Sequence, residues 1–116
     1  MAYVADYLAS EPRRDEVEAS RGRLALEFGA PWCPHCQVAQ PAFAQALHER
    51  ADAVHLKIED GKGRPLGRAF GIKLWPTLVL LRDGREVARV MRPRTPTDLA
   101  EALAQWDAVA ADPSPR

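Results

Sequence analysis

Cys33 and Cys36 are the only two cysteines of this chain, and they lie within the stretch Trp32-Cys33-Pro34-His35-Cys36. With two residues between them, one thiolate can attack a disulfide while the other releases the product. Two other interpretations stay open: a pair of inert core cysteines, or half of a zinc site completed by His35, His48 or His55. A closed structural zinc site takes four ligands, and the chain has no second cysteine pair. The spacing therefore favours a redox-active pair.

The length and the charge of the chain limit its organisation and its partners. Its 116 residues suffice for one domain, expected over residues 1–110, and the proline-containing residues 111–116 should form a disordered tail. The 16 Lys and Arg residues equal the 16 Asp and Glu residues, and neither sign is gathered into a block. We therefore expect no nucleic-acid partner, no membrane partner and a monomeric protein.

The N-terminal stretch leads us to expect a cytoplasmic protein. Residues 1–8 lack a basic region followed by an apolar run, because Asp6 interrupts the only candidate, and no other apolar run is long enough to span a membrane. Removal of a signal peptide would leave the same sequence, so a periplasmic location stays open. In a reducing cytosol an isolated cysteine pair is more often catalytic or metal-binding than a structural disulfide.

The segments around the cysteines predict a strand, a helix and a second strand. Residues 23–28 form an apolar strand candidate that ends at Gly29-Ala30-Pro31. Residues 34–50 carry an apolar stripe at helical spacing, with a kink expected at Pro41. Residues 53–58 alternate between apolar and polar side chains and should form the second strand. Two strands joined by such a helix should be parallel, with a right-handed crossover.

The second half of the chain predicts a hairpin and a C-terminal helix. Residues 77–82 and 85–91 are strand candidates on either side of Asp83-Gly84, a dipeptide that favours a type I′ turn. Thr95-Pro96-Thr97-Asp98 combines an N-cap, a first-turn proline and an acid three residues after the cap, so a helix should start there. Its expected core face is Leu99, Ala102, Leu103, Trp106 and Ala110.

Three shorter segments complete the expected fold. Ser10-Glu11-Pro12 offers an N-cap and an early proline for a surface helix through Ala19. A brief helix is expected near residues 66–70. Residues 3–8 have helical spacing but could equally form an edge strand or a loose arm, so the sheet should have four or five strands.

This order of elements, with Cys-x-x-Cys at the start of the first long helix, resembles the thioredoxin superfamily. The resemblance implies an α/β thioredoxin fold, with a central mixed sheet flanked by helices. It extends over roughly residues 11–106, nearly the whole chain. The residues that carry it are Phe28, Trp32-Cys33, Cys36, Pro41, Gly71-Ile72, Pro76-Thr77 and Asp83-Gly84.

The active-site sequence departs from that of thioredoxin itself. Pro34-His35 between the cysteines is similar to the dipeptide of the oxidising DsbA branch, where thioredoxins have Gly-Pro. Glu27 is also closer to DsbA than to the thioredoxin aspartate, and Gln37 and Trp75 replace a basic and a small aliphatic residue. The chain is too short for the helical domain that DsbA inserts. It resembles a single-domain thioredoxin-like protein with a DsbA-like Cys-Pro-His-Cys motif.

The resemblance implies a role for each residue of the motif. Cys33 is expected to be the nucleophile, because the N-terminus of a helix favours a thiolate, and Cys36 should be the buried resolving thiol. His35 either stabilises the Cys33 thiolate, which would raise the reduction potential, or is simply an exposed residue at the start of the helix.

Glu27 is the candidate proton-transfer residue of the site. On its strand, Leu24, Leu26 and Phe28 share one face and leave Glu27 on the other with Ala25. If helices cover both faces, Glu27 is buried. It would then exchange a proton with Cys36, as the matching acid does in the family. The alternative is a strand residue that faces solvent.

Substrate contact is expected from the loop that contains Pro76 and from the aromatic residues near the cysteines. Pro76 should be cis and should face the cysteines, which would leave the backbone of Trp75 free to pair with a substrate strand. Trp32 and Trp75 are expected to contact substrate, although both could be partly exposed core residues. His48 and His55 are expected to be surface or packing residues.

The predicted function is thiol–disulfide exchange with protein substrates. No metal, nucleotide or flavin is expected as a cofactor, because the Cys33–Cys36 disulfide itself is the redox group, and a separate dithiol partner would exchange electrons with it. A periplasmic disulfide oxidase or isomerase would share every residue named above. A redox-inactive interaction module is a third possibility, although such a module has no need for both cysteines.

Overall fold

The protein folds around one mixed sheet of four strands, in the order β2-β1-β3-β4. The structure is a computed structural model and describes residues 2–109. The strands are β1 (Arg23–Gly29), β2 (Val54–Glu59), β3 (Thr77–Arg82) and β4 (Arg85–Met91). The helices are α1 (Arg14–Glu18), α2 (Pro34–His48), α3 (Pro65–Ala69) and α4 (Pro96–Ala108). The expected mixed sheet flanked by helices is confirmed, and within the described residues it has four strands, not five.

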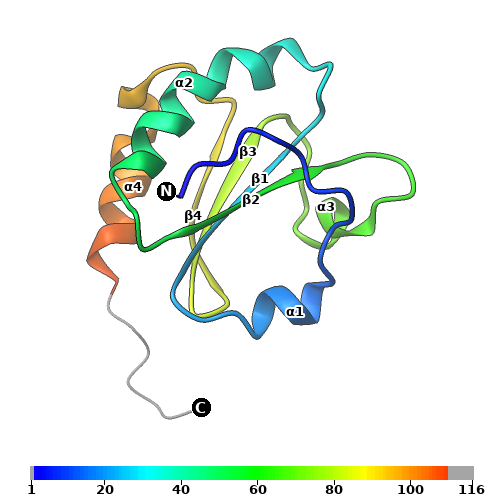
Figure 1. Ribbon diagram of the computed structural model, residues 1–116, viewed down its shortest axis with the longest axis horizontal. Coiled ribbons are helices and arrows are strands. Elements are labelled where there is room, and N and C mark those ends of the chain that lie inside the picture. Colours follow the sequence, from blue (N-terminus) through cyan, green and yellow to red (C-terminus); the bar gives the residue numbers. More distant parts are fainter. Residues whose placement is uncertain (1, 110–116) are drawn as a thin grey trace.

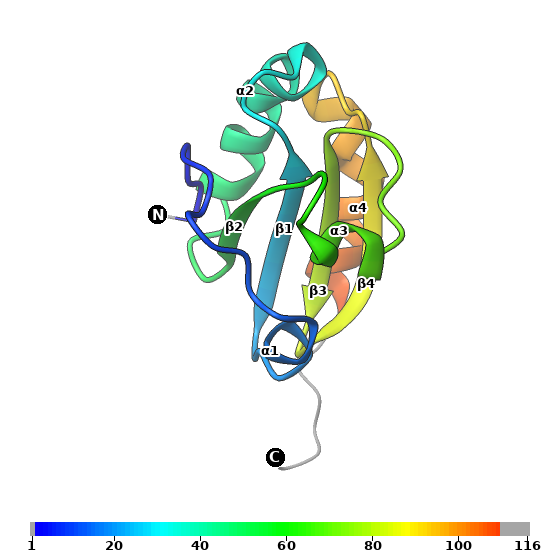
Figure 2. The same cartoon turned by 90° about the vertical axis from the view of Figure 1, so that its right-hand side faces the viewer.

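Helices cover both faces of the sheet, with α2 and α4 on one face and α1 and α3 on the other (Figures 1 and 2). Leu24, Leu26 and Phe28 of β1 pack in the cluster under α1 and α3, whereas Ala25 packs in the cluster under α2 and α4. Because side chains alternate along a strand, Glu27 points to the same face as Ala25. The face that carries Glu27 is therefore buried, as expected.

The β1-α2-β2 unit has the predicted parallel strands, and β3 pairs antiparallel with β1. In the parallel pair, Ala25 lies opposite His55 and Glu27 lies opposite Lys57. Helix α2 ends two residues before the expected position, and Pro41 lies inside it, so the kink stays a prediction. Its buried stripe is the predicted one: Cys36, Ala39, Ala42, Phe43, Ala46 and Leu47.

The hairpin and the C-terminal helix also follow the sequence pattern. Asp83 and Gly84 both have positive φ, 51° and 80°, as a type I′ turn requires. In α4 the Thr95 and Asp98 side chains form the predicted capping box. The core face of this helix consists of Leu99, Ala102, Leu103 and Trp106. Ala110 and the expected tail at 111–116 lie outside the described residues.

The N-terminal segments differ from the prediction. Helix α1 starts at Arg14 with Arg13 as its N-cap, so Ser10 does not cap it, and the Glu16 side chain accepts the N–H of Arg13 at 2.8 Å. Glu11 instead accepts the N–H of Leu66 at 2.9 Å, at the start of α3. Residues 2–9 form an irregular arm that lies beside α2 and β2 (Figure 1, dark blue).

An ion-pair network ties the start of β1 to the end of α2 and to α4. Arg50 Nη2 lies 2.7 Å from Asp107 Oδ2, and Arg23 also binds the Asp107 carboxylate. The hydrogen bond from Arg50, followed by that from Arg23, lowers the pKa of Asp107. A lowered folded-state pKa contributes stability above the ordinary Asp value that is lost as pH falls through the folded value.

We therefore expect Asp107→Asn to lower the free energy of unfolding at pH 7 by no more than about 1 kcal/mol, because the carboxylate is partly exposed. The difference from wild type should shrink steadily below about pH 4, where the wild-type carboxyl takes up its proton. Urea unfolding of both proteins at pH 7, 4 and 2.5 measures this. A difference that persists at pH 2.5 would mean that the amide disturbs packing and not charge.

Candidate active site

Cys33 and Cys36 lie at the N-terminus of α2, directly after the loop that leaves β1. Cys33 is the N-cap residue, and its Sγ accepts the backbone N–H of Cys36 at 3.3 Å. Pro34 occupies the first turn, where its missing N–H costs nothing. Cys33 and Cys36 are both buried, with 4% and 2% of their surface exposed. Cys33 Sγ thus lies where unpaired N–H groups of the helix can stabilise a thiolate.

Cys36 is held as a neutral thiol. Burial, followed by a hydrogen bond to Cys33, raises the pKa of Cys36 to about 12. Gly29, at the end of β1, makes room for this thiol, because a Cβ there would come within 2.6 Å of Cys36 Sγ and 3.2 Å of Tyr7 Oη. The Tyr7 hydroxyl therefore lies beside the Cys36 thiol. These contacts place the second sulfur in a close-fitting pocket behind the first.

Glu27 is fully buried, and its carboxylate is hydrogen-bonded on both oxygens. Oε1 lies 3.0 Å from His55 Nε2, and Oε2 accepts Gln40 Nε2 at 2.8 Å. The same Gln40 nitrogen donates to the Cys36 carbonyl at 2.8 Å, which links the acid to the helix that carries the thiols. A cation accompanies this buried carboxylate, because Lys57 Nζ lies 4.0 Å from Glu27 Oε2.

His55 and Lys57 of β2 are the residues that sequence reasoning missed. Both are buried, at 3% and 5% exposure, whereas the apolar Val54 is 54% exposed. His55 Nδ1 accepts the N–H of Val4 at 2.9 Å, so its Nε2 carries the proton donated to Glu27. His55 is a packing residue, as expected, but it packs against the buried acid.

Lys57 and Gln40 complete the hydrogen bonds around Glu27. Lys57 Nζ donates to the Ala5 carbonyl and to Gln40 Oε1, both at 2.9 Å, and Gln40 Oε1 also accepts the Tyr3 hydroxyl at 2.6 Å. The sequence feature that could have identified this cluster is the alternation of side chains along β2, which puts residues 55 and 57 on the same face. Residues 55 and 57 occupy the positions that a parallel register places beside Ala25 and Glu27.

The loop that contains Pro76 packs against the cysteines. The Trp75–Pro76 peptide bond is cis, as predicted. The half-buried Trp75 side chain packs against Cys33 and Cys36, and its Nε1 donates to Asp60 Oδ2 at 2.9 Å. Trp32 is 69% exposed, and its ring lies edge-on to Trp75 with the centroids 5.5 Å apart. Both tryptophans therefore border the surface beside the thiols.

The backbone of Trp75 is not as free as predicted. Arg92 Nε donates to the Trp75 carbonyl at 2.9 Å, and the Arg92 N–H donates to the Pro76 carbonyl at 2.7 Å. Arg92 has a φ of 51°, in the left-handed region that is uncommon for residues with a side chain. A substrate strand that pairs with the Trp75 carbonyl would have to displace this exposed guanidinium.

His35 and Gln37 lie on the exposed side of the first turns of α2. Gln37 Nε2 donates to the Pro31 carbonyl at 3.1 Å, across the start of the helix. The structure thus brings Cys33, Cys36, Trp75 and Trp32 together and connects Glu27 to them through Gln40. Two thiols, a buried acid and a bordering aromatic surface suit thiol–disulfide exchange.

Residues 2–109 contain neither a metal-binding cluster nor a membrane-spanning helix. There, His, Cys, Asp and Glu side chains nowhere form a group of three that could hold a metal ion. The helices of this part of the chain are all too short or too polar to cross a bilayer.

Comparison with known proteins identifies relatives over most of the chain. The thioredoxin family profile matches residues 6–105. The structure of thioredoxin 2 from Pseudomonas aeruginosa in its reduced form is 49% identical, with a TM-score of 0.80 over 90% of this chain and 98% of that one. A thioredoxin from Listeria monocytogenes is 27% identical over 78% of this chain and 89% of its own length.

Two other relatives are longer than this chain. Thioredoxin H2-2 from Oryza sativa is 35% identical over 59% of this chain, and protein disulfide-isomerase A2 from Pongo abelii is 37% identical over 72%. The matched region covers 51% of the rice protein and 16% of the isomerase, so the chain spans about half of the first and about a sixth of the second.

Proposed function

The chain belongs to the thioredoxin family, a family of thiol–disulfide oxidoreductases, and we propose that it exchanges disulfides with protein substrates through its Cys-Pro-His-Cys motif. The observation that carries the proposal is the placement of Cys33 as the N-cap of α2, with the buried Cys36 thiol directly behind it. The test is reduction of insulin disulfides in the presence of dithiothreitol. Acceleration over dithiothreitol alone is expected, and its absence would refute the proposal.

The reaction has two thiol–disulfide exchanges. The Cys33 thiolate attacks one sulfur of the substrate disulfide, and the other substrate sulfur leaves with the electron pair of the broken bond. Cys36 then loses its proton, attacks Cys33 Sγ and expels the second substrate sulfur. Glu27, which is connected to α2 through Gln40, is the proposed acceptor of that proton. A separate dithiol partner returns the Cys33–Cys36 disulfide to two thiols.

The substrate strand is proposed to lie along the loop that precedes β3. Trp32 and Trp75 offer aromatic surface beside the thiols, because their ring centroids lie 5.5 Å apart and Trp75 packs against the cysteines. Aromatic side chains supply binding area at little cost in side-chain entropy. The Arg92 side chain would turn away from the Trp75 carbonyl when the substrate binds.

The dipeptide Pro34-His35 also supports a second candidate function, that of a disulfide oxidase or isomerase. A histidine two residues after Cys33, in the first turn of the helix, would add a donor or partial positive charge near the thiolate and would stabilise the reduced pair. We expect a reduction potential roughly 60 mV above the value of about −270 mV for thioredoxin. Equilibration with glutathione buffers, read by trapping both redox forms, measures this potential.

A double variant is the matched control for the potential. Replacing Pro34 by Gly and His35 by Pro restores the thioredoxin dipeptide and should return the potential to about −270 mV. A wild-type potential at or below that of thioredoxin would remove both the tuning role of His35 and the oxidase candidate. A high potential that survives the double substitution would assign the effect to the rest of the site.

The cellular setting is proposed on chemical grounds. An isolated cysteine pair of this kind acts in a reducing cytoplasm as a reductase, whereas the same residues in an oxidising compartment would form disulfides. We place the protein in the cytoplasm as a monomer whose residues 1–110 fold as one unit, with no cofactor besides its own cysteines.

A further inference from the structure

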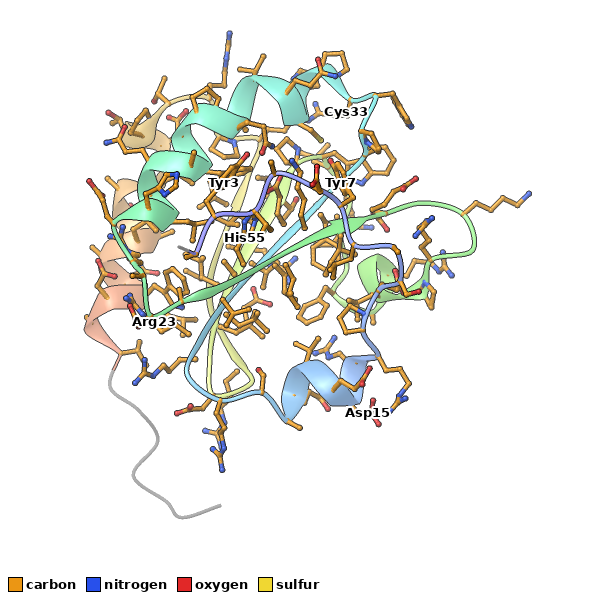
Figure 3. The ribbon with its side chains drawn as sticks, viewed as in Figure 1. Tyr3, Tyr7, Asp15, Arg23, Cys33 and His55 are labelled. Atoms are coloured by element: carbon orange, nitrogen blue, oxygen red, sulfur yellow. The ribbon has the colours of Figure 1, made fainter. Side chains whose placement is uncertain are left out.

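The N-terminal arm, residues 2–8, is irregular in structure yet is fixed in place by the buried polar groups of the site. The Val4 N–H donates to His55, the Ala5 carbonyl accepts Lys57, and the Leu8 N–H donates to the Lys57 carbonyl at 2.8 Å. Tyr3 stacks on His55 with the ring centroids 5.4 Å apart (Figure 3). An arm held by four separate contacts with β2 has a defined position for every side chain, including Tyr7.

Tyr7 is the residue of this arm whose hydroxyl lies beside the Cys36 thiol. Its ring lies 4.9 Å from Lys57 Nζ. The two groups meet beside Gly29, where a Cβ would contact both Tyr7 Oη and Cys36 Sγ. Burial, and then the nearby Cys36 and Glu27, raise the pKa of Tyr7. The hydroxyl therefore keeps its proton, and remains a donor, throughout the physiological pH range.

We propose that Tyr7 is a catalytic residue of the resolving step, in which its hydroxyl donates a hydrogen bond to the Cys36 sulfur as that sulfur becomes a thiolate. The inference rests on the proposed function and extends it to a residue outside the Cys-x-x-Cys segment. A hydrogen bond to a charged group stabilises it more than a bond to the neutral form does. Tyr7 thus opposes the burial that disfavours the Cys36 thiolate.

The step balances without a further reactant. The Cys36 S–H bond breaks and its proton goes to the Glu27 carboxylate, while Tyr7 keeps its own proton. The freed electron pair on Cys36 Sγ forms the Cys33–Cys36 bond, and the bond between Cys33 and the substrate sulfur breaks. The substrate sulfur leaves as a thiolate and takes a proton from solvent, so the substrate is reduced and the cysteine pair is oxidised.

The titration of Cys36 depends on the groups around it from each neighbouring element. Cys33, the N-cap of α2, and Glu27 on β1 disfavour its thiolate, whereas a hydrogen bond from the Ala30 backbone favours it. The Tyr7 hydroxyl on the arm lies beside Cys36, and Lys57 on β2 lies beside both Tyr7 and Glu27. Removing the Tyr7 hydroxyl should therefore move the pH dependence of the resolving step upwards. The first attack, at Cys33, should be unaffected.

The test compares Tyr7→Phe with wild type in a single turnover. Reduced protein is mixed with a peptide disulfide, quenched with acid at intervals, and the mixed disulfide at Cys33 is quantified by mass spectrometry. In Tyr7→Phe the mixed disulfide should decay on the order of tenfold more slowly at pH 7, with its pH profile moved to higher pH. The first attack is measured separately in a Cys36→Ser background, with and without Tyr7→Phe, and should stay equal.

Tyr3→Phe is the matched control, because it removes a hydroxyl from the same arm at a point that contacts Gln40 and neither thiol. It should slow the decay by less than about threefold and leave the pH profile in place. Unchanged decay in Tyr7→Phe, or equal slowing in both variants, would overturn the inference. Failure of the wild-type protein to reduce any disulfide would instead refute the proposed function itself, so the two failures are distinguishable.

Discussion

Replacing Cys33 by serine should reduce disulfide reductase activity to the rate of the uncatalysed reaction, whereas Cys36→Ser should stop the reaction at the mixed disulfide. Cys33 is the only thiol at the N-cap of α2, and Cys36 is the only other thiol in the chain. A serine hydroxyl at either position cannot take part in thiol–disulfide exchange at neutral pH. The two variants therefore separate the attacking sulfur from the resolving sulfur.

Two measurements check this assignment. Insulin reduction with dithiothreitol should give background rates for Cys33→Ser, and a protein disulfide substrate should remain covalently attached to Cys36→Ser on a non-reducing gel. The mixed disulfide should disappear on addition of dithiothreitol. Covalent trapping by Cys33→Ser in place of Cys36→Ser would reverse the two roles, and residual turnover in both variants would contradict a reaction through this pair.

Trp106→Ala should lower the free energy of unfolding by roughly 3 to 5 kcal/mol, the usual cost of truncating a large aromatic side chain in a core. Trp106 on α4 has none of its surface exposed and packs in the cluster under α2 and α4. Its Nε1 also donates to the Leu81 carbonyl at 2.9 Å, so the variant leaves a buried acceptor unpaired. A loss of this size is a large share of the stability of a small domain.

Trp106→Phe helps to separate the two contributions, because it removes the hydrogen bond but keeps a smaller aromatic ring in the core. It should cost about 1 to 3 kcal/mol, less than the alanine variant. Guanidinium unfolding followed by circular dichroism measures both variants, since loss of Trp106 would alter a tryptophan fluorescence signal. Equal losses in the two variants would mean that the hydrogen bond, and not cavity formation, dominates.

Much of the fold follows from local sequence signals. The Asp83-Gly84 turn, the capping box of Thr95 and Asp98 and the apolar stripe of α2 were all predicted, because turn conformation, capping and helical periodicity depend on neighbours in the sequence. The start of α1 was not predicted correctly. Ser10 was the expected N-cap, but Arg13 occupies that position, and the neighbouring Glu11 binds the distant N-terminus of α3.

The active site was also predicted only in part. The spacing of Cys33 and Cys36 and their position at a helix start were evident from the sequence, and the alternation along β1 correctly predicted that Glu27 is buried. The groups that surround Glu27 were not predicted. The alternation of β2 separates its two faces but does not tell which face is covered, so buried His55 and Lys57 were taken for ordinary strand residues.

The sequence by itself determined the redox pair, the order of the elements and the strand face that carries Glu27, because each depends on residues close together in the chain. Only the tertiary structure decided what surrounds that pair. The parallel register of β1 and β2 brings His55 and Lys57 to Glu27, and the N-terminal arm brings Tyr7 to Cys36 from 29 positions away. No local sequence pattern predicts these contacts, because they join segments that are distant in the chain and form only once the sheet and α2 are packed.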